Sequence, residues 1–355
     1  MKSRNYGIDV LRLCSTLGVV VLHVFGSTAN EIDGGINGCI SSFFQVLCMC
    51  SVNLFGLITG YLCVEKNQHR YFPLLRIIFQ VLFYSIIISI LVKIIRPEWI
   101  VGTRSFMESL FPFGSRLWYI TAYIFVYCMI PYINIFIASC DKITLKKFLM
   151  ITFFLLSCVT TFGLKDYFVI NMGYSCFWIL YMYFIGAYIR KYNICLNKSY
   201  ILILYLFTFS FLFGIKLFLL FFYSNVIEIF YTRFIAYCSP FVLVNSICVF
   251  CFMKDIDVKN IIFKRILEKL SLASLGVYII HAHGVILDNV IYKFMPKILG
   301  SNAFVFLFSG LFFSILVYVI CILIDIVRQI LEKYSKFIIL ESKISERIDI
   351  LLGCK

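Results

Sequence analysis

The stretch IDVLRLCSTLGVVVLHVFGSTA occupies residues 8–29 and consists almost entirely of apolar and small side chains. A helix of about 20 such residues crosses the ~30 Å hydrocarbon core of a bilayer. Only a short basic run, Lys2 and Arg4, precedes it, and no small-residue cleavage pattern follows it. We therefore expect a retained membrane span and not a removed signal peptide.

The rest of the chain repeats this pattern. Of its 355 residues, 62% are hydrophobic and 14% charged, and the mean hydropathy is +0.97, which excludes an ordinary soluble domain. Nine further apolar segments lie at 39–63, 72–95, 117–138, 147–163, 172–189, 199–222, 232–253, 272–292 and 302–327. We predict an all-α polytopic membrane protein with about ten transmembrane helices.

The basic residues set the orientation of these helices. The formal net charge of +14 would suggest nucleic acid as a partner of a soluble protein, but in membrane proteins Lys and Arg gather in cytoplasmic loops. With ten spans, 21 of the 32 Lys and Arg residues lie on the side of the two termini, 7 on the other side and 4 within spans. Both termini are therefore predicted to be cytoplasmic, and no nucleic-acid partner is expected.

Two loops, at about 96–116 outside and 254–271 inside, are longer than the others, and no soluble domain is evident. Residues 329–355 mix Leu and Ile with Lys and Glu at roughly helical spacing, a pattern typical of a helix on a membrane surface. We expect a ten-helix membrane domain over residues 1–328 and a cytoplasmic amphipathic tail over residues 329–355.

The 15 cysteines are scattered through the apolar segments, where small polarizable thiols are common packing residues. Cys248 and Cys251 form a CxxC pair, but no second pair and no histidine lies near it in the sequence. The sequence therefore predicts neither a disulfide framework nor a metal site.

Ionisable side chains inside spans are the candidates for function, because placing them in a bilayer is costly. Arg12 and His23 are eleven residues apart, so a helix brings them to within about 20° of one face, with ~16 Å between them along the axis. That face could hold an anion near the cytoplasm and a proton-transfer group deeper in. The spacing also fits an arginine that reaches lipid phosphates and a buried histidine bonded to another helix. Asp9 is a further candidate for the cavity wall: it could orient Arg12, or it could simply favour the helix N-terminus.

Aromatic and histidine residues in two later segments could line the same cavity. Tyr278 and His281 are three residues apart and share one helix face, although a histidine satisfied by a backbone carbonyl would give the same pattern. Trp118 and Tyr119 begin the fourth segment at the outer membrane interface. They fit an aromatic belt, and they also fit a stacking site for a sugar.

Five segments, in order, resemble the acyltransferase 3 family of integral-membrane enzymes, which transfer acyl groups to sugars of surface and secreted glycans. The first segment is similar to the family's first helix, whose arginine and histidine match Arg12 and His23. The other similar segments are SVNLFGLITGYLC (51–63), LWYITAYIFVYCMIP (117–131), YMYFIGAYI (181–189) and SLGVYIIHAH (274–283). The resemblance covers nearly the whole chain and implies a ten-helix membrane enzyme.

The resemblance implies an O-acyltransferase, with acetyl as the expected group, that uses cytoplasmic acyl-CoA as donor substrate and holds no bound cofactor. Arg12 and Arg76 would bind the donor's phosphates, since guanidinium groups match phosphate geometry. His23 would act as a base toward a sugar hydroxyl or would carry the acyl group itself. The family's arginine pair at the third helix is only partly matched, because Arg70 and Arg76 are six residues apart with Pro73 between them.

The expected location is the cell membrane, inner or plasma, and the expected partners are the bilayer, acyl-CoA and a glycan acceptor. The alternative is a transporter or flippase of lipid-linked glycan, although no internal repeat of the kind many transporters show is visible. A glycan polymerase would usually have a longer outer loop than the roughly 20 residues at 96–116. A scaffold has no need for arginine and histidine on one face of a span.

Overall fold

The computed structural model describes residues 4–28, 35–65, 70–113, 116–163, 165–222 and 232–334, together with 343, 344, 346, 347 and 349. These residues form helices joined by loops, and none of them lies in a β-strand. The predicted all-α membrane fold is confirmed.

Eight helical segments of the described chain are long and apolar enough to cross a membrane. They are α1 (Tyr6–Gly26), α2 with α3 (Ile36–Cys48, Ser51–Cys63), α4 (Phe72–Ile95), α6 (Trp118–Ser139), α7 with η2 and α8 (Lys142–Phe153, Phe154–Val159, Thr160–Phe162), α10 (Lys198–Phe221), η4 with α12 (Arg233–Ile235, Pro240–Met253) and α16 (Ala303–Tyr334). A ninth is bent by 59° between α13 (Ile261–Ala282) and the short helices α14, η5 and α15 (Gly284–Ile286, Leu287–Ile291, Phe294–Lys297).

The remaining described helices are η1 (Pro97–Trp99), α5 (Gly102–Leu110), η3 (Asn171–Gly173) and α9 (Cys176–Lys191). α9 lies where the sixth span was predicted but has only 16 residues, a length of about 24 Å. η1 and α5 occupy the predicted outer loop. α13 begins at Ile261, so about half of the predicted inner loop is helix.

α16 continues without a break past residue 328 to Tyr334. The rest of the predicted amphipathic tail lies almost entirely outside the described residues. Asp349 is described, and its carboxylate accepts a hydrogen bond from the backbone N–H of Tyr71, just before α4.

Glycines bring α3 and α9 into close contact at the centre of the bundle. A Cβ atom on Gly60 would collide with the backbone of Tyr183, and one on Gly186 would collide with the backbone of Leu57. Small residues at such positions let membrane helices approach closely. One polar contact between the two helices is a hydrogen bond from Trp178 Nε1 on α9 to Asn53 Oδ1 on α3 at 2.9 Å.

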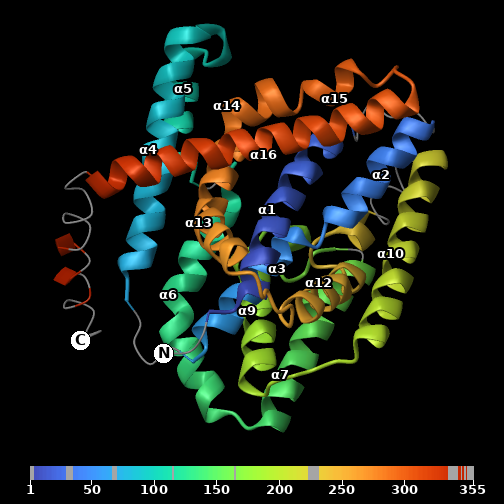
Figure 1. Ribbon diagram of the computed structural model, residues 1–355. Coiled ribbons are helices and arrows are strands. Elements are labelled where there is room, and N and C mark those ends of the chain that lie inside the picture. Colours follow the sequence, from blue (N-terminus) through green and yellow to red (C-terminus); the bar gives the residue numbers. More distant parts are fainter. Residues whose placement is uncertain are drawn as a thin grey trace.

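α1 is the helix around which the site is built. Asn5 caps its N-terminus by accepting a hydrogen bond from the Ile8 N–H. The helix packs against α2, α3, α12, α13 and α16. Figure 1 shows α16 lying obliquely across α1 and α13, and residue contacts among these three helices agree with that view. α1 therefore packs against helices on several sides.

Candidate active site

A single cavity of about 640 Å³ joins the predicted functional residues. Its wall is formed by residues of α1, α3, α4, α6, α13 and α16, with further residues from the loops before α6 and α9 and from the segment before α12. Arginines line the end near the start of α1, His23 lies farther along, and aromatic side chains line the other end. The two ends are called the inner and outer end below, after the predicted orientation.

Arg12 lines the inner end and is held by an acidic partner on its own helix. Its Nη1 lies 3.7 Å from Asp9 Oδ1. Asp9 is closer to Arg4, whose Nε donates to Oδ2 at 2.6 Å and whose Nη2 donates to Ser271 Oγ on α13 at 3.0 Å. The hydrogen bond to Asp9 raises the pKa of Arg4 above its ordinary value. Two permanent positive charges thus flank one buried carboxylate.

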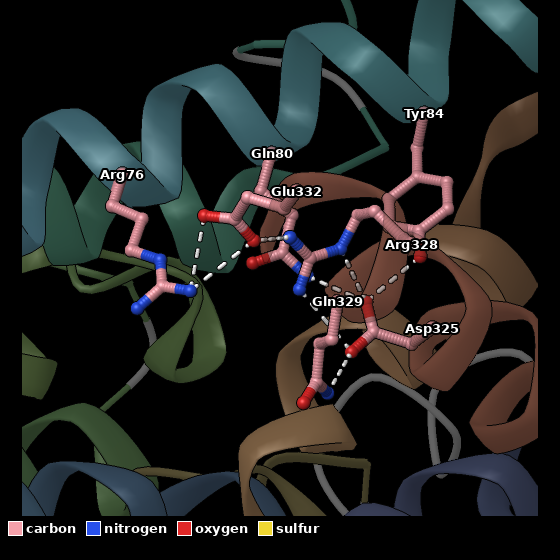
Figure 2. A network of polar contacts seen from close by, with 7 residues as sticks. All are labelled: Arg76, Gln80, Tyr84, Asp325, Arg328, Gln329 and Glu332. Carbon is pink, nitrogen blue, oxygen red and sulfur yellow. Dashed lines mark hydrogen bonds and ion pairs between the residues drawn. The ribbon is translucent and has the colours of Figure 1, made fainter. Parts of the chain in front are cut away.

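Two more arginines, Arg76 from α4 and Arg328 from α16, line the same end. Figure 2 shows the polar network that holds them. Glu332 lies between them, with Oε1 3.0 Å from Arg76 Nη2 and Oε2 2.6 Å from Arg328 Nη1. Asp325 forms an ion pair with Arg328 Nε at 2.8 Å. The inner end therefore carries three arginines whose guanidinium groups are oriented by carboxylates.

His23 lines the middle of the cavity and forms a pair with His281 of α13. His23 Nδ1 lies 3.2 Å from His281 Nε2, and His281 Nδ1 lies 2.6 Å from the carbonyl oxygen of Val277. His281 is fully buried behind His23, with 0% of its surface exposed. The ring of Tyr292 packs edge-on against His23 from the outer side.

The carbonyl of Val277 fixes which nitrogen of each neutral ring carries the proton. A carbonyl oxygen can only accept, so His281 Nδ1 must be the donor of that hydrogen bond. His281 Nε2 is then an acceptor, and His23 Nδ1 must donate to it. His23 Nε2 is left without a proton and with a free lone pair. The pair therefore prepares one nitrogen of His23 as a base.

Aromatic rings line the outer end. Trp118 begins α6, and its ring centroid lies 4.7 Å from that of Tyr174. It also stacks on the ring of Tyr237, with the centroids 6.1 Å apart and an interplanar angle of 26°. Asn53 of α3 holds this region by donating to the carbonyl of Tyr237 at 2.9 Å. Arg116 also lines this end, and its Nη2 lies 2.7 Å from Asp288.

The cavity brings together most of the predicted site residues and leaves two behind its wall. Those on the wall are Arg12, His23, Arg76, Trp118, Tyr119 and Tyr278. Asp9 and His281 were expected to line it but do not. Asp9 supports Arg12 and Arg4, and His281 supports His23. His283 points elsewhere, with Nε2 3.0 Å from the carbonyl of Ser109.

Sequence reasoning missed several lining residues. Arg328 lies at the very end of the predicted membrane domain, and Tyr174 and Tyr237 lie within predicted spans, but none of the three was given a role. Their helices or loops had to be placed in space before these side chains could be seen to converge. Asp325 was the one signal available, because it is an acidic residue inside an otherwise apolar segment.

The arrangement can bind an anion at one end and move a proton beyond it. Arginine forks bind phosphate or carboxylate, and an imidazole with a free lone pair accepts a proton from a hydroxyl. Among the described residues, no group of three or more His, Cys, Asp or Glu could hold a metal ion.

Comparison with known families assigns the chain. The model of the acyltransferase domain of the acyltransferase 3 type matches residues 5–325, which includes α1 with Arg12 and His23 and α13 with His281. No curated protein and no solved structure matches the chain. Because the match covers nearly the whole chain, this multi-pass membrane protein belongs to the acyltransferase 3 family and is an acyltransferase that acts on groups other than amino-acyl groups.

Proposed function

We propose that this protein transfers an acyl group, acetyl in the simplest case, from cytoplasmic acyl-CoA to a hydroxyl group of a surface polysaccharide or lipid-linked glycan at the cell membrane. The observation that carries the proposal is the order of side chains along one cavity: arginines, then a prepared histidine, then aromatic rings. Each group matches one part of such a reaction.

The inner end suits the phosphates of the donor. Arg12, Arg76 and Arg328 come from three different helices and line one end of the cavity. Planar guanidinium groups bind phosphate oxygens in pairs. From Arg12 to His23 the axis of α1 rises by ~16 Å, a distance of the same order as an extended phosphopantetheine arm. The thioester of a donor anchored at the arginines would therefore lie close to His23.

The outer end suits a sugar. Trp118, Tyr174 and Tyr237 form a cluster of rings beside the cavity, and aromatic faces with polar tips pack well against amphipathic ligands. A hydroxyl group presented from this side would approach His23 opposite the donor.

The chemistry follows from the free lone pair. His23 Nε2 removes the proton of the acceptor hydroxyl while the hydroxyl oxygen attacks the thioester carbonyl carbon. The C–O bond forms, the C–S bond breaks, and the thiolate leaves with the bonding electron pair. His23 then returns its proton to the thiolate, so the products are an O-acyl ester and free CoA. His281 spreads the positive charge that His23 carries in between.

The test is transfer of radiolabel from acetyl-CoA and longer acyl-CoA donors to glycans in membranes that contain this protein. We expect His23→Ala to lower transfer by about 100-fold or more, since general-base contributions are of that size. Arg12→Ala should weaken donor use. His283→Gln is the control, because His283 is a fully buried histidine at the C-terminal end of α13 that does not line the cavity.

All variants are compared at equal amounts of membrane protein. Labelling that persists in His23→Ala, or that is absent in the wild type with every donor and glycan source, would overturn the proposal. The second result would favour transport of a lipid-linked glycan.

A further inference from the structure

Besides Asp9, which lies beside Arg12, two carboxylates contact the other arginines of the inner end, and the first of them, Asp325, is tightly enclosed. Its side chain is fully buried, and a Cβ atom on Gly276 of α13 would collide with it. Figure 2 shows it surrounded by donors from α4 and α16. It accepts hydrogen bonds at 2.8–2.9 Å from Gln80 Nε2, Tyr84 Oη, Arg328 Nε and Gln329 Nε2.

This enclosure fixes Arg328. Its Nε and Nη2 lie 2.8 and 3.3 Å from the two oxygens of Asp325, so the fork is held from one side. A buried carboxylate with so many donors is strongly stabilised as an ion and cannot leave its partner without a large desolvation cost. Arg328 therefore keeps one orientation, on the cavity wall, whatever else binds there.

The second carboxylate, Glu332, belongs to the same network but is less completely enclosed: its side chain is 10% exposed, whereas that of Asp325 is 0% exposed. It lies two helical turns after Asp325 and two residues before the end of α16. Its carboxylate bridges Arg328 and Arg76, and the Arg76 side chain is 47% exposed. A glutamate side chain also has more rotamers than an aspartate side chain. Glu332 thus occupies the positions that an incoming anion would take on Arg76.

The charges support an exchange. In the network of Figure 2, the two positive charges of Arg76 and Arg328 face the two negative charges of Asp325 and Glu332. A phosphate oxygen could replace the Glu332 carboxylate on both guanidinium groups without leaving either arginine unpaired. Arg12 and Ser271 line the same end and face the same space.

The proposed function places the donor's phosphates beside Arg12, Arg76 and Arg328. We propose that Asp325 positions Arg328 for this phosphate site, and that Glu332 occupies the site until phosphate displaces it. The identity of the donor rests on the proposed function. The chemistry recognised is a phosphate group at the inner membrane surface, which both CoA and an anionic lipid headgroup carry. Arg328 lies beyond the region matched by the family model.

The test is binding of CoA to the full-length protein in zwitterionic detergent, measured by calorimetry, with pantetheine as the phosphate-free probe. Glu332→Gln should tighten CoA binding by about tenfold, because it removes a charged competitor. Asp325→Asn and Arg328→Lys should weaken it by about tenfold, since each loses a charge-assisted pair. If the two carboxylates only stabilised the fold, replacing either one should change CoA affinity in the same direction. Opposite changes in CoA affinity would therefore not be expected from a purely structural network.

Glu65→Gln is the matched control. Glu65 pairs with Arg190 at 2.8 Å near the predicted cytoplasmic surface but does not line the cavity, so its loss removes the same charge and should leave CoA binding unchanged. CoA binding by Glu332→Gln tests the proposal even if the Asp325 and Arg328 variants fold poorly.

The second arm measures phosphatidylglycerol retained by wild type and Glu332→Gln. CoA binding that is unchanged or weaker in Glu332→Gln, with lipid retention also unchanged, overturns the proposal. Pantetheine that binds as tightly as CoA also overturns it. Lipid retention that rises in the variant while CoA does not bind keeps the phosphate site but removes CoA as donor. CoA binding that follows the predicted pattern without acyl transfer supports the site and refutes the function proposed above.

Discussion

At the scale of single residues, the site depends on a histidine that another histidine orients. Hydrolases commonly use a carboxylate to hold a catalytic histidine in one tautomer. Here the buried partner of His23 is His281, and the Val277 carbonyl fixes the tautomer of both rings. A neutral partner avoids burying another charge in the middle of the membrane, where it would be costly.

Replacing His281 should slow acyl transfer without changing donor binding. His281→Phe removes the acceptor for His23 Nδ1–H, so His23 is free to present the wrong tautomer, and we expect a loss of about 10- to 100-fold in transfer at saturating donor. His281→Gln offers a side-chain oxygen as acceptor and should restore part of the rate. The measurement is the transfer rate together with the affinity for CoA. Equal rates in the Phe and Gln variants would contradict a positioning role.

The residue-scale predictions from sequence were strongest where local spacing decides. Arg12 and His23 share one helix face because eleven residues make close to three turns, and both line the cavity. The partner of His23 could not be inferred. α1 and α13 are more than 230 residues apart in the chain, and no local sequence pattern in either helix predicts their contact. Asp9 and His281 were expected on the cavity wall, but they lie behind it, where they contact Arg12 and His23.

At the scale of elements, the contact of α3 with α9 sets the frame for the outer end. α3 carries Gly56 and Gly60 at a four-residue spacing, and Gly186 of α9 faces Leu57. The close approach brings Asn53 and Trp178 together, and Asn53 in turn holds the carbonyl of Tyr237 beside the cavity. The element pair thus positions aromatic side chains that are distant in sequence.

A larger side chain at the contact of α3 with α9 should destabilise the fold. A side chain at Gly60 would meet the Tyr183 backbone, which cannot move without separating the helices, so Gly60→Val should cost about 1–3 kcal/mol or more. Gly214→Ala on α10 is the control, since nothing lies within 4 Å of its Cβ position and alanine favours helix by about 1 kcal/mol. The readout is the fraction of monodisperse protein after extraction and its melting temperature. A Gly60→Val protein as stable as Gly214→Ala would refute the close packing.

The sequence predicted the elements well where apolar runs are long and poorly where they are short or broken. The predicted spans at 8–29 and 72–95 agree with α1 and α4 within a few residues. The ninth predicted span, 272–292, does not match one helix, because α13 starts at Ile261 and the chain bends after Ala282. High hydropathy is required of a helix that faces lipid. Most of α9 is enclosed by other helices, so this helix need not be long or uniformly apolar.

At the scale of the whole molecule, one cavity connects an anion site at one end with aromatic rings at the other, and His23 lies between them. Under the proposed function, such a path would let a charged donor and a sugar acceptor meet inside the protein, away from bulk water. Composition and charge distribution predicted the membrane location and the orientation, but the cavity results from the packing of six helices and is not visible in any one segment.

The most direct test of this account is the effect of Val19→Phe on acyl transfer and on CoA binding, measured on the same purified protein. Val19 lines the cavity on the face of α1 that carries Arg12 and His23, and lies between them. A phenyl ring there would block the path from the arginines to His23. We predict that CoA still binds while transfer from acetyl-CoA is lost. Transfer at the wild-type rate by folded Val19→Phe protein would contradict the claim that the acyl group reaches His23 through this cavity.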